Sequence, residues 1–455
     1  MTDRTHDLER DAGCCPASGI SRRDFLKTVG AGGVVLAAGT GLAPAEARAA
    51  VRTSAHIVIV GAGAGGITAA AKLNRWLDGA RLTIIDSRKT HVYQPGLTLV
   101  ANGIYQRDEV LADNADYIPE EVNWIQADAA EFDPEASTVV TSTGQRVGYD
   151  YLIVATGCHL DFAAIEGMET RLIGREGIGS TYYGPDGAHA TYLMSEKFIE
   201  TGGTALFTIP ATPLKCAGAP VKAAFLTESR MREAGTRGKG EYLYLASSGS
   251  LFGQPDFRDI VRNLFEEKDI HYDYFHVLKA IDPGARTATF STQTGEDTYK
   301  YDYIHVVPPM RAPDAVLNSP LAWQEGNFAS GGWMEVDKHT LQHRRYPNVF
   351  GCGDVVGTPV GKTAASVKYQ APIAAENLVA LIAGKAFEGH YNGYTSCPLV
   401  TGLGTAALAE FNYDFELTPT FPLIDETRES WIWWWFKVSL FKPYYFTMLR
   451  GWIPV

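Results

Sequence analysis

The sequence contains 455 residues, of which 45% are hydrophobic and 20% are charged. These values are ordinary for globular domains, so they exclude a disordered or fibrous chain, and the length suits two or three domains. The net charge is -12, with 40 Lys and Arg against 52 Asp and Glu. This balance argues against nucleic acid as a partner, because phosphate contacts need a basic surface.

The first 49 residues predict a twin-arginine export signal. The segment 21–27, Ser-Arg-Arg-Asp-Phe-Leu-Lys, precedes an uncharged run over 28–44, and Ala47-Arg48-Ala49 suits signal cleavage. The run is short and rich in Gly and Ala, which makes a permanent membrane anchor the weaker interpretation. We expect a bacterial protein that is exported to the periplasm after folding, which fits one that takes up a prosthetic group first.

A dinucleotide-binding unit follows directly. A buried strand is predicted over 56–60, then Gly61-Ala-Gly63-Ala-Gly-Gly66, then a helix over 67–77, and a second strand over 82–85 ends at Asp86. The glycines allow a tight turn, the helix N-terminus offers free N–H groups to a pyrophosphate, and Asp86 can accept hydrogen bonds from a ribose. A glycine-rich turn without a ligand is the weaker alternative.

An internal repeat joins 137–154 to 287–306, and each copy predicts a β-hairpin followed by a return strand. The first copy ends in Ala155-Thr156-Gly157. A second Rossmann-like half is expected from the strand predicted over 205–209. Prolines and Cys216 follow this strand in place of a second glycine fingerprint, so we expect that this half lacks a nicotinamide site.

The segment 346–354, Tyr-Pro-Asn-Val-Phe-Gly-Cys-Gly-Asp, resembles the second FAD motif of flavoproteins with two dinucleotide-binding domains. The resemblance implies that Asp354 holds FAD and that Thr156 and Gly157 form the FAD-side junction. A helical pattern opens at 361–363 and continues to 378, and its N-terminal dipole could face a reduced flavin. Lys362 could offset negative charge there, with an ordinary exposed lysine as the alternative.

Two cysteines stand out among the four that would remain after signal cleavage. Cys216 precedes a predicted helix start at Pro220, where free N–H groups favour a thiolate. Cys397 lies in a turn-rich segment after the helix predicted to end near 378. The two could pair in an oxidising compartment, although sequence alone fixes no connectivity. With no CxxC or clustered His, we expect no metal site.

Four segments resemble those of sulfide:quinone oxidoreductases, and the likeness covers essentially all of residues 55–455. They are Lys-Cys-Ala-Gly-Ala-Pro at 215–220, Gly-Tyr-Thr-Ser-Cys-Pro at 393–398, Val-Pro-Pro-Met at 307–310 and Tyr-Gln-Pro at 93–95. No cysteine occurs at 181–184, which favours the two-cysteine type similar to the mitochondrial enzymes.

The resemblance implies a catalytic pair, Cys216 and Cys397, that is bridged at rest directly or through extra sulfur. Sulfide would attack at Cys397, leaving a persulfide there and a sulfur anion at Cys216 beside the flavin. Electrons would pass through FAD to a membrane quinone, and the sulfur would leave or grow into polysulfide. No residue is identified as the base that deprotonates hydrogen sulfide.

The remaining chemistry-bearing residues are interpreted more simply. Cys158 and Cys352 are expected to be inert and buried. His91 and Tyr93 could line the flavin pocket. Three other histidines are predicted to pack in the protein interior: His271, His276 and His305.

The C-terminal residues are unusually aromatic, with five of the nine tryptophans in the last 25 residues, interspersed with Lys437, Lys442 and Arg450. Aromatic rings beside basic residues suit a lipid headgroup interface, so we expect peripheral membrane contact near the quinone. A dimer contact or a lid over the core is the alternative, and a homo-oligomer stays open.

The expected fold is α/β, with two Rossmann-like dinucleotide-binding domains as in glutathione reductase and a C-terminal aromatic, membrane-interfacial segment. The expected divisions are a signal over 1–49, the FAD-binding domain over 50–165 and 331–388, the second Rossmann-like domain over 166–330, and a quinone and membrane-contact region over 389–455.

Three other functions were weighed. The flavoprotein subunit of a flavocytochrome c sulfide dehydrogenase typically attaches FAD through a cysteine in a Tyr-x-Cys-Pro segment, whereas Gln94 stands between Tyr93 and Pro95 here. Non-covalent FAD is therefore expected. A type II NADH dehydrogenase would need the second glycine fingerprint. A flavin-binding module without turnover is the remaining alternative.

Overall fold

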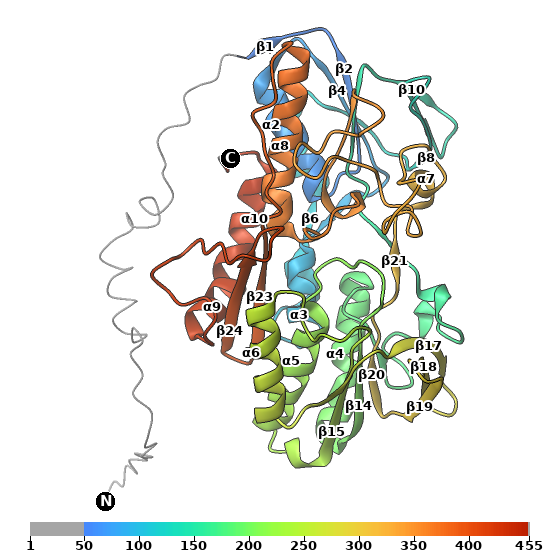
Figure 1. Cartoon of the computed structure of the whole chain (residues 1–455), viewed down its shortest axis with the longest axis vertical. Helices are drawn as coiled ribbons and strands as arrows, with labels where there is room; N and C mark the ends of the chain where they lie inside the picture. Colours follow the sequence, from blue (N-terminus) through green and yellow to red (C-terminus); the bar gives the residue numbers. More distant parts are fainter. Residues whose placement is uncertain (1–49, 454–455) are drawn as a thin grey trace, which may run out of the picture. The chain divides into compact units, whose positions relative to one another are not determined.

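The computed structural model describes residues 50–453, so the predicted export signal lies outside the described residues. The first of two five-stranded parallel sheets has the strand order β22-β11-β2-β4-β7 and joins distant parts of the chain (Figure 1). Its strands are β2 (His56–Val60), β4 (Arg81–Ile85), β7 (Asn123–Ile125), β11 (Tyr151–Val154) and β22 (Val349–Gly351). Helices α2 (Ala64–Trp76) and α8 (Ala364–Ile382) pack against each other beside it.

The second sheet is also parallel and has the order β13-β20-β14-β15-β16. Its strands are β13 (Ile178–Gly179), β14 (Gly203–Thr208), β15 (Gly240–Leu245), β16 (His271–Asp273) and β20 (Tyr303–His305). Helices α4 (Gly184–Thr201), α5 (Ala219–Glu233) and α6 (Pro255–Glu267) share a buried core with it. The α/β fold with two dinucleotide-binding domains is thereby confirmed.

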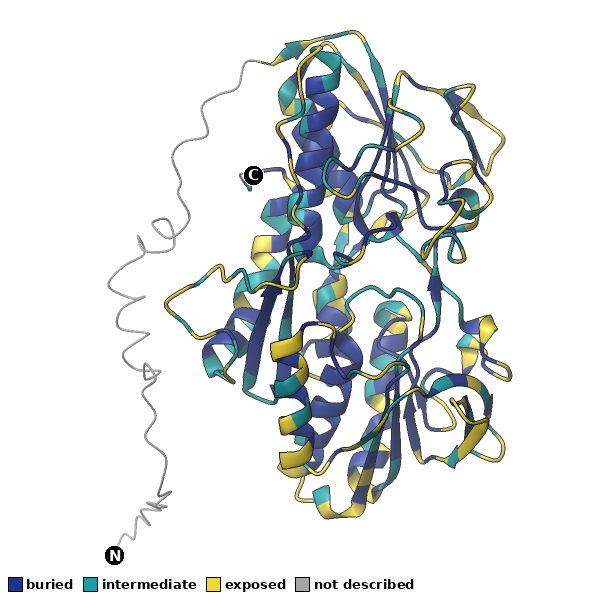
Figure 2. Ribbon diagram, viewed as in Figure 1, coloured by how far each residue is buried: buried dark blue, intermediate teal, exposed yellow. Residues whose placement is uncertain are grey.

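Continuous apolar runs explain why these strands lie in the centre of the molecule. Residues 57–60 of β2 and 152–154 of β11 are fully or almost fully buried, as strands of a parallel sheet covered on both faces must be (Figure 2). The strand predicted over 205–209 begins two residues earlier, and the helix predicted over 67–77 begins at Ala64.

The repeat forms the predicted hairpin and return strand in both copies. In the first copy, β9 (Thr138–Thr141) and β10 (Arg146–Gly148) form the hairpin, and β11 then enters the first sheet beside β2. In the second copy, β18 (Thr287–Ser291) and β19 (Glu296–Lys300) form the hairpin, and β20 enters the second sheet beside β14. A further strand extends each hairpin: β8 (Ala129–Asp133) in the first and β17 (Val277–Asp282) in the second.

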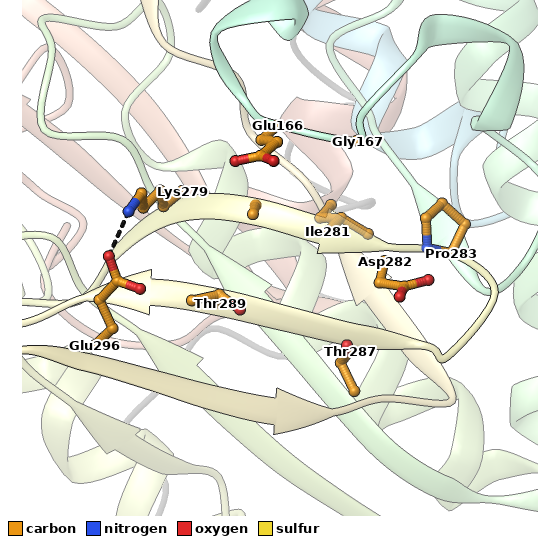
Figure 3. A pocket seen from close by; sticks show the side chains of 10 residues that line it. Glu166, Gly167, Lys279, Ile281, Asp282, Pro283, Thr287, Thr289 and Glu296 are labelled. Carbon is orange, nitrogen blue, oxygen red and sulfur yellow. Dashed lines mark hydrogen bonds and ion pairs between the residues drawn. The ribbon is translucent and has the colours of Figure 1, made fainter.

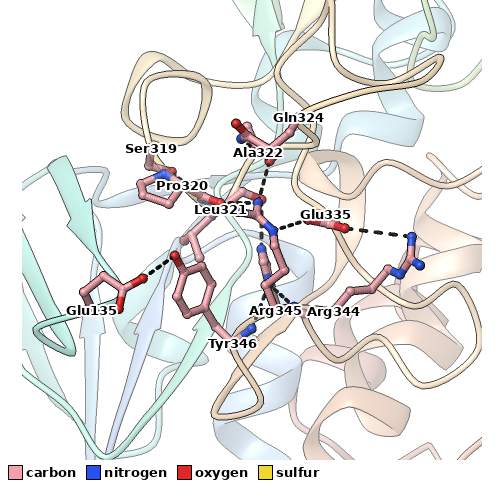
Figure 4. Close-up of polar contacts among 11 residues, drawn as sticks. Glu135, Ser319, Pro320, Leu321, Ala322, Gln324, Glu335, Arg344, Arg345 and Tyr346 are labelled. Atoms are coloured by element: carbon pink, nitrogen blue, oxygen red, sulfur yellow. Dashed lines mark hydrogen bonds and ion pairs between the residues drawn. The ribbon is translucent and has the colours of Figure 1, made fainter.

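A polar cluster fastens the chain where it returns to the first sheet (Figure 4). The guanidinium of Arg345 donates to the Glu335 carboxylate over 2.7 Å and to the carbonyls of Pro320 and Ala322. The buried ring of His343 accepts from the amides of Arg345 and Tyr346. These bonds hold the residues just before β22 against the 319–324 loop.

The C-terminal residues form a strand pair, β23 (Thr395–Gly402) and β24 (Thr405–Phe411), and then the helices α9 (Trp431–Trp435) and α10 (Phe441–Leu449). A turn of π-helix, Phe436–Leu440, separates the two helices. Shorter elements complete the described chain: β1 (Val51–Arg52), β3 (Leu77–Asp78), β5 (Thr90–Val92), α3 (Leu97–Val100), β6 (Leu111–Asp113), β12 (His159–Leu160), β21 (Met310–Arg311) and α7 (Asp314–Leu317).

The end of the tail docks on α2. The Lys72 amine donates to the Ile453 carbonyl over 2.7 Å, and the Arg75 guanidinium donates to the carbonyls of Arg450 and Gly451. Trp433 is buried, while Trp452 remains 61% exposed. Within residues 50–453, no helix combines the length and apolar character needed to cross a bilayer.

Candidate functional site

Cys216 and Cys397 lie 181 residues apart in the chain and meet around one lysine. The Lys222 amine lies 3.5 Å from the Cys216 sulfur and 3.6 Å from the Cys397 sulfur. Both cysteines are free, and the Cys397 thiol donates a hydrogen bond to the Cys216 sulfur. The structure therefore brings together the two predicted redox residues.

The backbone explains how each sulfur reaches this position. Cys397 points from β23 toward α5, next to Gly218, where a Cβ atom would approach its sulfur to 2.5 Å. Cys216 has a left-handed backbone with φ of 50°, and its amide donates to the Lys362 carbonyl over 2.8 Å. The Tyr182 hydroxyl donates to the Cys216 carbonyl over 3.0 Å. Such a backbone is unfavourable for a non-glycine residue, so these bonds hold the sulfur where α5 begins.

The two thiols differ in their ease of ionisation. The hydrogen bond from Cys397, and then the charges of Lys222 and Lys437, hold the pKa of Cys216 well below its usual value despite burial. The same hydrogen bond, together with burial, raises the pKa of Cys397. Burial lowers the pKa of Lys222, but the two sulfurs outweigh it and raise this pKa to about 12. The reduced pair therefore consists of a Cys216 thiolate, a Cys397 thiol and a lysinium ion.

A second cation comes from the aromatic tail. Lys437 lies in the π-helical turn, is 2% exposed, and donates from its amine to the Pro95 carbonyl. Burial and the charge of Lys222 lower the pKa of Lys437 to about 7, although both cysteines act in the opposite direction. This residue can therefore gain or lose a proton near neutral pH within reach of the sulfur pair.

The glycine fingerprint forms an open cradle at the start of α2. Gly61 has φ of 108°, and a Cβ atom on Gly66 would lie only 1.8 Å from the Gly61 carbonyl oxygen. A Cβ atom on Gly63, by contrast, would meet nothing within 4 Å. No side chain caps the helix N-terminus at Gly63. Free N–H groups beside open space fit a pyrophosphate.

Asp86, the predicted ribose contact, is buried directly after β4. It accepts from the Ala62 amide over 2.6 Å and from the Arg88 guanidinium over 2.6 and 3.0 Å. Although burial opposes it, the bonds from Arg88 lower the pKa of Asp86. The carboxylate thus joins the glycine turn to the second strand.

The other residues predicted to contact FAD are Thr156, Gly157 and Asp354. The Thr156 hydroxyl is buried without a partner among the described residues, and next to it Gly157 faces open space. Asp354 is half-buried, and its charge acts on Tyr445, Cys158 and Lys362. An orphaned hydroxyl and open space fit a bound FAD between the two halves of this domain.

Lys362 is buried, so the alternative of an exposed lysine is wrong. Its amine donates to the carbonyls of Asp354 and Val356 over 2.6 and 2.7 Å and lies 3.8 Å from the centre of the Trp333 ring. Burial lowers its pKa to about 8. A lysine held beside Asp354 can supply positive charge at the start of α8.

Other residues depart in part from expectation. Cys352 is fully buried against Gly65, as predicted. Cys158 is only half-buried, and partial burial raises the pKa of the Cys158 thiol to about 11. The interior position predicted for His271 is wrong, because its side chain is 73% exposed. His276 and His305 are buried, although Nδ1 of His305 lacks a partner among the described residues. The His91 ring bonds Asn114 and Tyr445, which ties it to the tail.

A separate pocket of about 440 Å³ lies beside the hairpin of the second repeat copy (Figure 3). The ion pair between Lys279 and Glu296 crosses one side of it. Its lining contains none of the cysteines or predicted FAD contacts. It therefore contributes nothing to the sulfur site.

Three residues of the site were missed by sequence reasoning: Tyr182, Lys222 and Lys437. Lys222 had a local signal, because a side chain one turn into a helix points back toward the N-terminus, where Cys216 lies. Lys437 and Tyr182 had none, since only tertiary packing brings them to the sulfurs.

The comparisons with known proteins agree with this geometry. A family model for pyridine nucleotide-disulphide oxidoreductases matches residues 55–189. The mitochondrial sulfide:quinone oxidoreductases of Dictyostelium discoideum and Mus musculus are each 36% identical to the chain, over 87% of its length and 86% of theirs. The crystal structure of the sulfide:quinone oxidoreductase from Aquifex aeolicus superposes with a TM-score of 0.73 at 22% identity, covering 87% of this chain and 92% of the other. The chain belongs to the sulfide:quinone oxidoreductase family.

Proposed function

We propose that the chain oxidises sulfide through Cys216 and Cys397 and passes the electrons by way of FAD to a membrane quinone. The observation that carries this proposal is the buried cluster of two sulfurs and Lys222, with 3.5 and 3.6 Å contacts. Curated relatives with 36% identity bear the name of this activity. FAD, when bound, supplies a two-electron acceptor that a quinone can reoxidise.

The two cysteines have different roles because their environments differ. In the bridged form, sulfide attacks the Cys397 sulfur, forms a new S–S bond there and displaces the Cys216 sulfur as a thiolate. The lysinium of Lys222 stabilises that leaving thiolate. Cys397 keeps the added sulfur until an acceptor removes it, which leaves Cys216 and Cys397 reduced. Re-forming the bridge between them releases the two electrons that FAD would accept. Lys437 adds a second positive charge whenever it is protonated.

The test is anaerobic addition of sulfide to the purified yellow protein. We expect the flavin to bleach and to recover its colour with a short-chain quinone but not with cytochrome c. Cys216→Ser and Cys397→Ser should each retain FAD but lose sulfide-driven quinone reduction. Near-normal turnover in either variant would refute the sulfur relay.

FAD is held without a covalent bond in this proposal. Gln94 occupies the position next to Pro95 and accepts from the Lys215 amine over 2.8 Å, so no thiol stands there. Acid precipitation should therefore release all of the flavin into the supernatant. Flavin that remains with the precipitated protein would contradict non-covalent binding.

The aromatic tail contacts the periplasmic face of the inner membrane in this proposal, after export by the twin-arginine pathway. Trp452 and Tyr444 in the tail and Leu423 in the loop before α9 expose large apolar groups, with 61%, 43% and 98% exposure. Triple substitution by Ser should abolish sedimentation with lipid vesicles. A Lys-Lys replacement of Arg22-Arg23 should leave the protein in the cytoplasm. Light scattering of the detergent-free protein tests for a homo-oligomer.

A further inference from the structure

Two glutamates are buried on the side of β24 that faces the tail. Glu410 pairs across the strands with Ser396, and Cys397 pairs with Ala409. Because side chains alternate along a strand, Glu410 lies on the face opposite to the Cys397 sulfur. Glu410 is 3% exposed, and Glu426, from the loop before α9, is 5% exposed. Neither forms an ion pair with Lys, Arg or His within residues 50–453.

Both oxygens of the Glu410 carboxylate accept hydrogen bonds. It accepts from the Tyr394 hydroxyl, from the Thr420 amide over 2.9 Å and from the Thr420 hydroxyl over 2.7 Å. Two of these three donors belong to Thr420, so the side chain of Glu410 is tied to the loop. The Glu410 carbonyl also accepts from the Thr418 amide over 3.0 Å, so this residue secures the beginning of the loop by both side chain and backbone.

Glu426 has the opposite environment. Its Oε2 atom is buried without a hydrogen-bond partner among the described residues. Burial, followed by the negative charges of Glu410 and Asp425, raises the pKa of Glu426 to about 7. The nearby cations do not neutralise the pair: Arg428 pairs with Asp425, and Lys368 lies over the Tyr394 ring at 5.1 Å. The buried position of Glu426 therefore favours its neutral, protonated form.

The loop that these glutamates secure leads directly to Lys437. The Leu408 amide donates to the Glu426 carbonyl over 2.9 Å, and Ala406 and Ser430 exchange backbone hydrogen bonds. Ser430 then caps α9, which ends just before the π-helical turn containing Lys437. The Phe421 ring packs on Trp433 and on Phe436, the residue next to Lys437.

We propose that Glu410 and Glu426 are positioning residues that clasp the 412–430 loop onto β24, Glu410 through its bonds to Thr418 and Thr420 and Glu426 as a buried neutral acid, and thereby hold Lys437 against the cysteine pair. Ionisation of Glu426 opens the clasp, because a buried carboxylate without a counter-ion is costly. The link to turnover rests on the proposed function. The clasp itself is defined by contacts that need no sulfide or quinone.

Glu426→Gln in the full-length, FAD-loaded protein tests the clasp, because Gln copies the protonated carboxyl group in size. The measurement is hydrogen exchange of the amides over 416–430, corrected for the intrinsic effect of pH. In the wild type, the clasp should be closed near pH 4.5 and should loosen as the pH rises toward 7, where Glu426 loses its proton. Exchange should therefore increase at least about tenfold between pH 5 and pH 7. In Glu426→Gln it should remain slow throughout.

The matched control is Glu429→Gln, which removes an exposed carboxylate from the same loop. It should exchange as the wild type does. A wild-type rate that does not rise with pH, a Glu426→Gln variant that still responds, or a Glu429→Gln variant that loses the response would each overturn the proposal.

Labelling of lysines with a water-soluble succinimidyl ester at pH 7.5 tests whether opening of the clasp makes the Lys437 amine accessible. Lys437 should react at least about tenfold more slowly in Glu426→Gln than in the wild type, because Lys437 is only 2% exposed while the loop is closed. The half-exposed Lys368 should react equally in both. Equal labelling of Lys437 in both proteins would overturn its positioning by the clasp. Failure of sulfide to bleach the wild-type flavin would refute the proposed function. The hydrogen-exchange and lysine-labelling results would still test the clasp, because neither measurement uses sulfide or quinone.

Discussion

Removal of the positive charge between the two sulfurs should make Cys216 less acidic, because Lys222 is the stronger of the two cations that lower the pKa of this thiol. Lys222→Met keeps the length of the side chain but removes the charge 3.5 Å from the Cys216 sulfur. With an effective dielectric constant of about 20, two unit charges at this distance interact by about 4.7 kcal/mol. That energy corresponds to about 3.5 pKa units.

The observed change should be smaller than this limit, because Lys437 remains nearby and keeps its proton more readily once Lys222 no longer repels it. We therefore expect the pKa of Cys216 to rise by about 2 units. The assay is the rate of alkylation of Cys216 in the reduced protein as a function of pH, followed by mass spectrometry of the Cys216 peptide.

Lys215→Met is the matched control, since Lys215 neighbours Cys216 in the chain but extends its amine to Gln94. This variant should leave the alkylation profile almost unchanged. A rise of less than half a unit in Lys222→Met would refute the claim that Lys222 stabilises the thiolate.

Three further substitutions test other parts of the structure. Lys437→Met should slow alkylation of Cys216 at pH 6 and have little effect at pH 8.5, because Lys437, with a pKa of about 7, carries its charge only at the lower pH; equal slowing at both values would contradict this. Gly66→Ala should lower the free energy of unfolding by about 1–3 kcal/mol, because the new Cβ atom meets the Gly61 carbonyl. Gly63→Ala, whose Cβ atom meets nothing, should keep the melting temperature of the FAD-free protein but weaken FAD binding; calorimetry can measure both effects. Arg345→Met should cost about 1–3 kcal/mol in urea unfolding because it removes three hydrogen bonds, to Glu335 and to the carbonyls of Pro320 and Ala322. An unchanged midpoint would refute the role of that cluster.

Features encoded by short segments could be predicted from the sequence. The strand over 56–60, the glycine turn and the acidic end of β4 are local patterns whose physical meaning does not depend on the rest of the chain. The internal repeat gave both hairpins and their return strands for the same reason. The cysteines were found through family resemblance, because nothing in the spacing of Cys216 and Cys397 requires them to meet.

Features that depend on distant packing were not predictable. Lys437 stands among aromatic residues and reads as a surface charge, yet the tail folds inward and places it at the Pro95 carbonyl with 2% exposure. The aromatic stretch over 271–276 suggested that both of its histidines pack inside, but His271 ends up in solvent while His276 is buried. Burial of charge is set by neighbours from other elements, which a linear pattern does not contain.

The docking of the tail on α2 affects the order in which the protein matures during synthesis. Both cysteines and Lys222 leave the ribosome before Lys437 and before the 450–453 segment that bonds to Lys72 and Arg75. A nascent chain therefore contains its reactive thiols before it has the second cation that favours their ionisation. The Cys216 thiolate therefore gains its full electrostatic stabilisation only once the end of the chain has been made and has docked.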